Sequence, residues 1–301
     1  MNEVKKIWLD GEFVDWQNAK THILTHTLHY GGGVFEGIRA YETKNGPAVF
    51  RLKEHIDRFF YSASCLDMKM PFTKEEIEKA ILETIKVNEV KECYIRPLAF
   101  FGYGNMGLNP LNSPVSVSIS LWPWGAYLES AKPIKVKISK YRRLDPKSVI
   151  SDAKVCGYYV NSILATLDAQ KNGFAESLLL DSDGYVAEGP GENVFMIKDN
   201  KVYTPALGSI LPGITRDSCV KIFKDLSFEV IEKKISPEEI KEADEVFLTG
   251  TAAEVCPVGQ IDDVLINNGE IGKITENIKN IYKKIVKGEE EKYLNWLTFV
   301  K

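Results

Sequence analysis

The 301-residue sequence has few of the residues that build disulfide frameworks and metal sites, with four histidines and five cysteines. The cysteines are widely spread and contain no Cys-x-x-Cys pair, so we expect reduced thiols and neither a disulfide framework nor a zinc site. His22 and His26 stand four residues apart, but no cysteine or carboxylate set completes a tetrahedral site, and nearby β-branched residues favour an extended segment. The sequence therefore predicts no bound metal.

The sequence also lacks long apolar runs and a strong excess of either charge. No apolar run approaches the ~20 residues that cross a bilayer, and the N-terminus has no basic region followed by an apolar signal core. The formal net charge of -4 gives no electrostatic reason to expect nucleic acid. We therefore expect a cytoplasmic protein that binds neither membranes nor nucleic acids.

What the chain does have is length and an ordinary globular composition. Hydrophobic residues make up 44% and charged residues 27%, and 301 residues exceed what one hydrophobic core usually holds. The hydrophobic pattern lapses between Pro123 and Pro133. We therefore expect an N-terminal domain over 1–125, a connecting loop over 126–133 and a C-terminal domain over 134–301.

Periodicity and turn residues predict helices and strands in both domains. Asp10-Gly11 predicts a hairpin, Thr73 with Glu76 predicts a capped helix, and Thr215 is expected to cap a later helix. In the first domain we expect helices over 52–65 and 74–88 and strands over 93–102 and 115–121. In the second we expect strands over 134–138, 178–180, 185–187, 194–197, 202–203 and 245–248, and helices over 157–171, 274–285 and after 213 and 236. The helix over 157–171 is expected to turn inward Val160, Ile163, Leu164 and Leu167.

Several local features could carry chemistry, and each also has an ordinary structural explanation. The glycines at 31–33 could line a substrate or form a turn that enters a strand. The helix start after Gly213 offers unpaired N–H groups to an anion, although an ordinary capped helix is the simpler explanation. Glu188, on a tight turn between apolar strands, either faces solvent or needs a cationic partner. Lys154 precedes a predicted helix, but nothing local distinguishes it from a surface lysine.

Eight segments spread over essentially the whole chain form a consistent set: LHYGGGVFEGIRAY, VFRLKEHIDRF, YIRPL, PWGAYL, AKVCGYY, GYVAEGPGENVF, LPGITRD and TGTAAEVCPV. Together and in this order they resemble the branched-chain aminotransferases, members of the class IV, or fold type IV, group of pyridoxal-phosphate enzymes. The resemblance implies an α+β fold of two α/β domains, with the cofactor pyridoxal 5'-phosphate at their interface. It also implies an enzyme that exchanges amino groups between leucine, isoleucine or valine and 2-oxoglutarate.

The resemblance assigns roles at the cofactor. Lys154 is similar to the lysine that binds pyridoxal phosphate covalently and then moves a proton, and Glu188 is similar to the carboxylate that faces the pyridine nitrogen. Tyr159, five positions after Lys154, matches the tyrosine that contacts the ring oxygen. The resemblance implies that the phosphate is bound by Arg58, by the backbone of Ile214 and Thr215, and by Thr251.

For the substrate, the resemblance implies an aromatic pocket that also accepts a carboxylate. The α-carboxylate is expected at Tyr94 and the Thr251-Ala252 turn, and the distal carboxylate of 2-oxoglutarate or glutamate at Arg96 with Arg39. The apolar side chain is expected against Phe35, Tyr30, Trp124 and Tyr127. The loop that carries Met106 and Leu108 is expected to reach the neighbouring subunit's site, which implies a homodimer or a higher homo-oligomer such as a hexamer.

The chain departs from the family at Cys156 and Tyr158, where a small residue and an asparagine are common. Glu192 and Asn193 match the family, and we expect them to shape a turn. A D-amino-acid aminotransferase and an aminodeoxychorismate lyase share this fold and remain alternatives, although the YIRPL and PWGAYL segments favour the branched-chain assignment. A catalytically silent scaffold module is a further alternative, which the combination of Lys154 with the other cofactor residues disfavours.

Overall fold

The computed structural model describes residues 3–123 and 132–301, and its strands form two sheets. The chain divides into two compact units. The first contains the described residues up to 123 together with Ala153–Tyr158 and Lys284–Lys301, and the second contains 132–152 and Tyr159–Lys283. Both units mix helices with strands, as expected for an α+β protein.

The first unit contains a sheet of eight strands whose pairings are antiparallel. The strand order is β17-β5-β4-β6-β7-β1-β2, and β3 pairs with β6. The strands are β1 (Lys6–Leu9), β2 (Glu12–Asp15), β3 (Gly33–Phe35), β4 (Ile38–Thr43), β5 (Gly46–Phe50), β6 (Cys93–Phe101), β7 (Val115–Trp122) and β17 (Leu297–Phe299). Asp10 and Gly11 have φ values of 49° and 101°, as a type I′ turn requires, so the predicted hairpin is confirmed.

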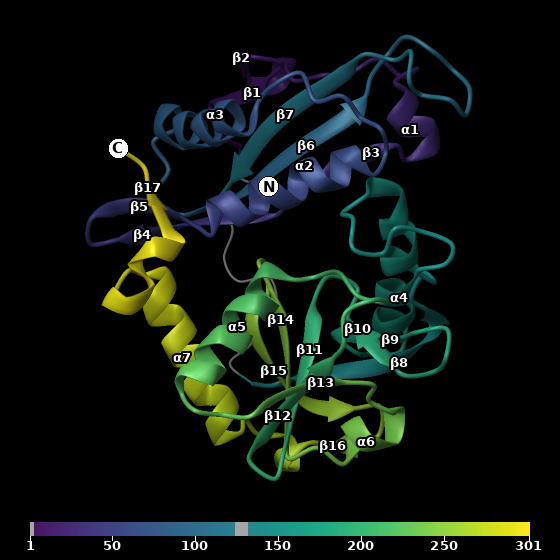
Figure 1. Ribbon diagram of the computed structural model, residues 1–301, viewed down its shortest axis with the longest axis vertical. Helices are drawn as coiled ribbons and strands as arrows, with labels where there is room; N and C mark the ends of the chain where they lie inside the picture. Colours follow the sequence, from purple (N-terminus) through teal and green to yellow (C-terminus); the bar gives the residue numbers. More distant parts are fainter. Residues whose placement is uncertain (1–2, 124–131) are drawn as a thin grey trace. The chain divides into compact units, whose positions relative to one another are not determined.

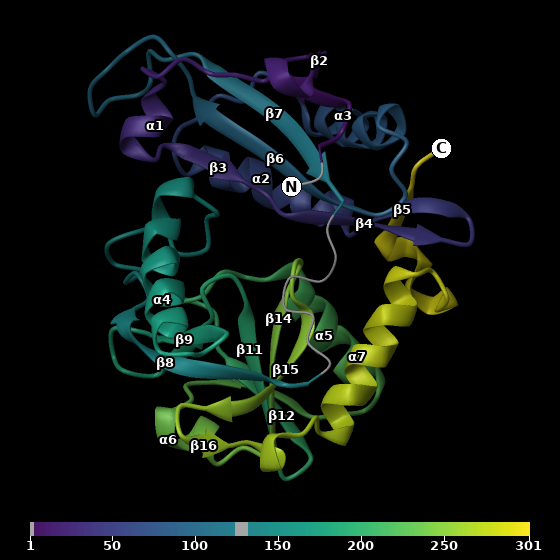
Figure 2. The ribbon, with the colours of Figure 1, turned by 180° about the vertical axis from the view of Figure 1, so that it is seen from behind.

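The two longer helices of the first unit agree with their local signals. These helices, α2 (Leu52–Ser64) and α3 (Lys74–Val87), pack against each other (Figures 1 and 2). α3 begins with the predicted capping box of Thr73 and Glu76. The extended segment expected around the histidines is partly wrong, because α1 (His26–Tyr30) is a short helix that ends at Gly31 with a φ of 71°. The 3-10 helices of this unit are η1 (Trp16–Asn18), η2 (Cys156–Tyr158) and η4 (Glu291–Trp296).

The first unit includes two segments that the predicted boundary assigned to the C-terminal domain. The C-terminal strand β17 pairs with β5, and the N–H of Arg51 donates to the carbonyl of Trp296 at 2.7 Å. The segment that carries Lys154 is joined by a bridge between Val34 and Val155. These contacts link residues far apart in the sequence, which hydrophobic periodicity does not reveal. These units therefore differ from the predicted division, which assigned Lys154 to the C-terminal domain.

The second unit contains a mixed sheet of nine strands. The strand order is β10-β9-β8-β15-β14-β11-β12-β13, and β16 pairs with β15. The parallel pairs are β8 with β9, β8 with β15, and β12 with β13. The strands are β8 (Ile134–Arg142), β9 (Glu176–Leu180), β10 (Val186–Glu188), β11 (Asn193–Lys198), β12 (Lys201–Pro205), β13 (Val230–Lys233), β14 (Glu245–Gly250), β15 (Glu254–Ile261) and β16 (Val264–Leu265).

The predicted helices of the C-terminal half are present, with one change of cap. They are α4 (Tyr159–Lys171), α5 (Ile214–Asp225), α6 (Pro237–Lys241) and α7 (Lys273–Val286), with the 3-10 turn η3 (Asn267–Gly269). Ser236 caps α6 by accepting a hydrogen bond from the N–H of Glu239 at 3.1 Å. The prediction that Thr215 caps α5 is wrong, because Gly213 is the N-cap and Thr215 is buried in the first turn.

Helix α4 contacts β8 and β9 (Figure 2) but buries a different face from the predicted one. Ala165 and Ala169 are fully buried, and these small side chains let the helix lie close to the sheet. The prediction of an inward apolar stripe is therefore wrong. The four residues of the predicted stripe are exposed instead: Val160 59%, Ile163 55%, Leu164 40% and Leu167 45%. We call these four residues the α4 apolar face.

Candidate active site

Lys154 is fixed by its backbone to two elements of the first unit. Its N–H donates to the hydroxyl of Ser62 on α2 at 2.9 Å, and its carbonyl accepts from the N–H of Phe35 at 3.2 Å. Its Nζ lies 4.9 Å from the centre of the Phe35 ring. The side chain is therefore a half-buried amine held beside an aromatic ring, unlike an ordinary surface lysine.

The surroundings of Lys154 favour its neutral amine. Burial and the positive charge of Arg58 lower the pKa of Lys154 to about 8, against the opposing effect of Glu36. An unperturbed lysine has a pKa of ~10.4. A larger fraction of Lys154 is therefore uncharged near neutral pH, which a nucleophilic or proton-transferring amine requires.

Glu36 organises this corner of the first unit, and sequence reasoning missed it. Its carboxylate is fully buried and accepts from Arg58 Nε at 2.6 Å, Arg58 Nη2 at 2.9 Å and His55 Nδ1 at 2.8 Å. Burial raises the pKa of Glu36, but Arg58 and His55 outweigh it and hold the pKa well below its usual range. Glu36 thus stays ionised and orients the Arg58 guanidinium. An isolated carboxylate directly after the apolar pair Val34-Phe35 was the available signal.

Arg96 is held among aromatic rings of the same sheet. Its guanidinium carbon lies 4.7 Å from the ring centre of Phe35 and 5.4 Å from that of Tyr94, and the Trp122 ring is 5.6 Å away. Arg96 Nε is buried and has no hydrogen-bond partner among the described residues. A Cβ at Gly37 would lie 1.9 Å from the Tyr94 hydroxyl, so the glycine makes room for that tyrosine. The rings hold the planar Arg96 guanidinium in one orientation, and a carboxylate could bind to it.

The other predicted substrate residues of the first unit have different surroundings. Arg39 Nη2 donates to Glu92 at 3.0 Å, and its guanidinium lies 4.8 Å from the ring centre of Tyr41. Exposure is 46%, 44% and 87% at Tyr30, Met106 and Leu108. Trp124 and Tyr127 lie outside the described residues. The substrate roles of all these residues stay predictions.

In the second unit, Glu188 is a buried carboxylate with fixed oxygens. Arg143 Nε donates to one oxygen at 2.5 Å, while Asn193 Nδ2 at 3.2 Å and the N–H of Leu211 at 3.0 Å donate to the other. Asn193, expected only to shape a turn, also donates to the carbonyl of Leu211 at 2.9 Å. Sequence reasoning missed Arg143, because no local pattern links it to a residue 45 positions away.

The beginning of α5 is suited to an anion. Its N-cap, Gly213, provides no side-chain hydrogen bond, and a Cβ there would lie 1.9 Å from the Asn193 side-chain oxygen. Ile214 and Thr215 follow as buried residues of the first turn. The first N–H groups of a helix lack intrahelical partners and carry the positive end of its dipole. This geometry keeps the predicted phosphate role of Ile214 and Thr215 open.

Three further predicted site residues lie at the ends of two elements of the second unit, two of them predicted for the cofactor and Ala252 for the substrate. Tyr159 is the first residue of α4, and Thr251 and Ala252 directly follow β14; all three are half-buried. Nearby in sequence, Thr249 has a buried hydroxyl oxygen without a hydrogen-bond partner in the described part of the chain. The assigned roles of the three predicted residues stay predictions.

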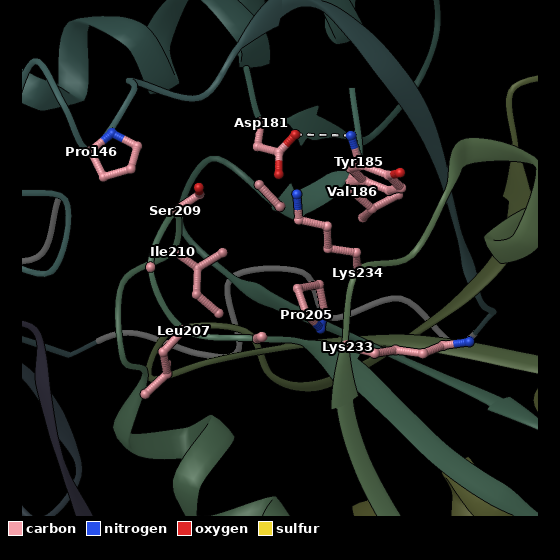
Figure 3. Close-up of a pocket in the computed structure, with 13 residues that line it drawn as sticks. Pro146, Asp181, Tyr185, Val186, Pro205, Leu207, Ser209, Ile210, Lys233 and Lys234 are labelled. Atoms are coloured by element: carbon pink, nitrogen blue, oxygen red, sulfur yellow. Dashed lines mark hydrogen bonds between the residues drawn. The ribbon is translucent and has the colours of Figure 1, made fainter. Parts of the chain in front are cut away.

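A cavity of about 140 Å³ in the second unit contains none of the predicted site residues (Figure 3). It adjoins a cavity of about 320 Å³, and the two share the lining residues Pro146, Leu207, Gly208 and Ile210. Two lysines line the smaller cavity, but Lys234 pairs with Asp183 at 2.8 Å and Lys233 pairs with Glu239. Because both charges are already neutralised, we assign this cavity no ligand.

Comparison with known proteins decides the family. The model of the family "Amino-transferase class IV" matches residues 33–261. The chain is 45% identical to the branched-chain-amino-acid aminotransferase of Pseudomonas aeruginosa over 98% of this chain and 97% of that protein. The chain belongs to the class IV aminotransferases.

Solved structures match this class IV aminotransferase over nearly its whole length. The crystal structure of the branched-chain amino acid aminotransferase from Escherichia coli has a TM-score of 0.97 and 39% identity, and the match covers 99% of this chain and 100% of that one. The crystal structure of the branched-chain amino acid aminotransferase from Thermobaculum terrenum, in its PLP-bound holo form, has a TM-score of 0.94, 32% identity and full coverage of both chains.

These relatives confirm the predicted fold, the predicted aminotransferase activity toward branched-chain amino acids and the predicted pyridoxal-phosphate cofactor. They do not favour the D-amino-acid aminotransferase or the lyase. The side chains of this class IV aminotransferase fit the cofactor. The first unit contributes the Lys154 amine, with its lowered pKa, and the nearby Arg58, and the second unit contributes the buried carboxylate of Glu188. Within the described ranges, no helix is both long and apolar enough to cross a membrane.

Proposed function

We propose that this class IV aminotransferase transfers the amino group of leucine, isoleucine or valine to 2-oxoglutarate, with pyridoxal phosphate bound covalently by Lys154. The observation that carries the proposal is the Lys154 amine, with its pKa lowered to about 8 beside Phe35 and Arg58. When bound, the cofactor supplies an electron sink for negative charge at the substrate Cα. The neutral Lys154 amine takes the proton from the substrate Cα and delivers it to the cofactor.

The proposal assigns the cofactor contacts as follows. Arg58 provides positive charge for the phosphate, and its bidentate contact with Glu36 supports this role by fixing the guanidinium. Glu188 faces the pyridine nitrogen, and the three donors on its carboxylate support a fixed orientation. The remaining cofactor contacts are proposed for Tyr159, Ile214, Thr215 and Thr251.

The substrate contacts separate carboxylates from the apolar side chain. Arg96 meets the distal carboxylate, which is supported by its buried Nε, an atom without a hydrogen-bond partner among the residues that the structure describes. Arg39 acts in support only, since Glu92 already accepts from its guanidinium. Tyr94 and Ala252 bind the α-carboxylate. The apolar walls are proposed for Phe35, Tyr30, Trp124 and Tyr127, with Met106 and Leu108 contributed by a neighbouring subunit.

The enzyme is proposed to be a cytoplasmic homodimer or a higher homo-oligomer. The α4 apolar face and the loop residue Leu108, which is 87% exposed, leave apolar surface uncovered in the single chain. Such surfaces mark interfaces between protein chains. The five cysteines are free thiols, which supports a reducing compartment.

Steady-state rates test the proposed reaction. Holoenzyme is assayed with L-leucine, L-isoleucine, L-valine and D-alanine as donors to 2-oxoglutarate, and separately with aminodeoxychorismate. We expect turnover with the three branched L-amino acids, and activity confined to D-alanine or to aminodeoxychorismate would contradict the proposal. Sedimentation equilibrium of the same preparation tests the oligomer, and a monomer at assay concentration would contradict that part.

A further inference from the structure

His26 connects two parts of the first unit that are 81 positions apart in the sequence. Its Nε2 lies 2.7 Å from the carbonyl oxygen of Gly107, in the loop between β6 and β7. Because a carbonyl only accepts, Nε2 donates the hydrogen of this bond. The residue is 2% exposed, and Nδ1 has no hydrogen-bond partner among the described residues. The buried ring therefore directs its Nε2–H at the loop.

The segment before His26 holds the same loop, residues 102–114, near its first strand. The N–H of His26 donates to the carbonyl of Gly102 at 3.2 Å, and Thr25 pairs with Tyr103. The ring of Tyr103 lies 4.5 Å from that of His22. These contacts fix the base of the 102–114 loop, whereas the bond from His26 to Gly107 reaches its middle.

Gly107 stands between the two loop residues proposed to enter the neighbouring subunit's site. Met106 and Leu108, on either side of it, are 44% and 87% exposed, so their own chain packs little against them. The centre of the His26 ring lies 4.7 Å from the ring centre of Tyr30, a proposed wall of this chain's own substrate pocket. His26 therefore contacts both a proposed wall of its own pocket and the loop proposed to serve the partner's pocket.

We propose that His26 is a positioning residue that fixes the 102–114 loop, so that Met106 and Leu108 form an apolar wall of the neighbouring subunit's substrate site. The inference rests on the proposed homo-oligomeric aminotransferase. Loss of the Nε2 donor leaves the Gly107 carbonyl without this partner and frees the middle of the loop, while its base stays attached. The wall contacts an apolar side chain in both the bound substrate and the transition state, so its loss raises KM more than it lowers kcat.

Three substitutions separate the donor from the ring. His26→Phe keeps a ring against Tyr30 but has no donor, His26→Gln can place an amide nitrogen near the Nε2 position, and His26→Asn reaches only the Nδ1 position. We expect the Phe and Asn variants to raise the KM for L-leucine about tenfold, with kcat and the KM for 2-oxoglutarate within about twofold of wild type. His26→Gln should restore most of the leucine KM. His29→Phe, on the same short helix, is the matched control with wild-type kinetics.

Mixed oligomers test whether the effect crosses the subunit boundary. One mixture combines a His26→Phe chain with a Lys154→Ala chain, so each intact lysine receives a loop held by a normal His26 of its partner. The reciprocal mixture combines wild type with the His26→Phe/Lys154→Ala double variant, so each intact lysine receives the released loop. Doubly tagged heterodimers isolated from each mixture should show a wild-type leucine KM in the first case and a raised one in the second.

The outcomes separate this inference from the proposed function. A wild-type enzyme without leucine activity would remove the proposed function and the inference with it. With an active wild type, an unchanged leucine KM in His26→Phe would overturn the inference alone. A raised leucine KM in the first heterodimer, where His26→Phe and the intact Lys154 are on the same chain, together with a wild-type KM in the reciprocal one would do the same. Thermal unfolding of each variant identifies a folding defect, and the Gln and Asn pair still decides the role of the donor if the Phe variant fails to fold.

Discussion

The two units each contain a buried carboxylate paired with an arginine, but the pairs are built differently. In the first unit, Arg58 donates twice to the fully buried Glu36, which His55 also contacts. In the second, Arg143 donates to one oxygen of Glu188, and neutral donors satisfy the other. In the proposed site Arg58 and Glu188 meet the cofactor. The carboxylate thus orients the arginine in one unit, and the arginine orients the carboxylate in the other.

Removing Lys154 gives the largest expected effect. In the proposed site, the Arg58–Glu36 and Arg143–Glu188 pairs only position the cofactor on which the Lys154 amine acts. Lys154→Ala should leave the protein folded and abolish measurable transamination of L-leucine, since no amine remains to bind the cofactor or move the Cα proton. Amino-group transfer to 2-oxoglutarate is measured at saturating pyridoxal phosphate. The exposed Lys147→Ala is the control and should keep the wild-type rate; steady turnover by Lys154→Ala would contradict the assignment.

Glu188→Gln tests the pair in which the carboxylate is functional. The amide keeps the shape of the side chain but loses the charge proposed to face the pyridine nitrogen, so kcat should fall roughly a thousandfold, or about 4 kcal/mol in activation free energy. Rates are compared at saturating cofactor, together with the melting temperature of each protein. Glu192→Gln, in the adjoining turn, should stay within about twofold of wild type. Equal rate losses in the two variants would show that the turn, and not the charge of Glu188, is responsible.

Glu36→Gln tests the pair in which the carboxylate is structural. It leaves the Arg58 guanidinium without its charged partner, and breaking a buried ion pair from one side costs about 3 kcal/mol of unfolding free energy. Urea denaturation of the apoenzyme measures this loss, and kcat at saturating pyridoxal phosphate should fall far less than in Glu188→Gln. Glu42→Gln, which breaks an exposed pair with Lys91, should leave stability unchanged. A Glu36 variant as stable as wild type would remove the contrast between the two pairs.

Local signals in the sequence predicted local structure well. The hairpin at Asp10-Gly11 and the capping box at Thr73 depend on neighbouring residues, and both are present. Helix α4 shows the limit of such signals. Its apolar spacing is helical, but which face becomes buried depends on the strands it packs against, and these accept Ala165 and Ala169.

The candidate site divides in the same way. Motif resemblance assigned Lys154 and Glu188, while the residues that orient the site were missed. Glu36 meets Arg58 across 22 positions, and Arg143 meets Glu188 across 45. Such pairs form only once separate elements pack together, and a single charged residue in the sequence does not indicate its partner. The oligomer stays a proposal for the same reason, since one chain presents only half of an interface.

A third buried carboxylate sharpens the comparison because its hydrogen-bond donors are neutral. Glu176 is 2% exposed and accepts from the N–H of Ser177 at 2.9 Å and the hydroxyl of Thr166 at 3.3 Å. Burial raises the pKa of Glu176 to about 7, whereas Arg58 and His55 hold that of Glu36 low. A raised carboxyl pKa adds stability that is full below the unfolded value of ~4.3 and is lost as pH rises toward the folded value.

Glu176→Gln should therefore remove this pH dependence while keeping the oxygen that accepts both hydrogen bonds. Relative to wild type, the variant should gain about 3 kcal/mol of unfolding free energy between about pH 4.5 and about pH 8, because the wild type must ionise a buried carboxyl over that range. Urea denaturation of both proteins across the range measures the gain. The exposed Glu270→Gln is the control and should follow the wild-type curve. If the unfolding free energy of the Glu176 variant also follows that of wild type across this pH range, neutral donors alone keep this carboxylate ionised. The arginines beside Glu36 and Glu188 would then orient those carboxylates without being needed for their charge.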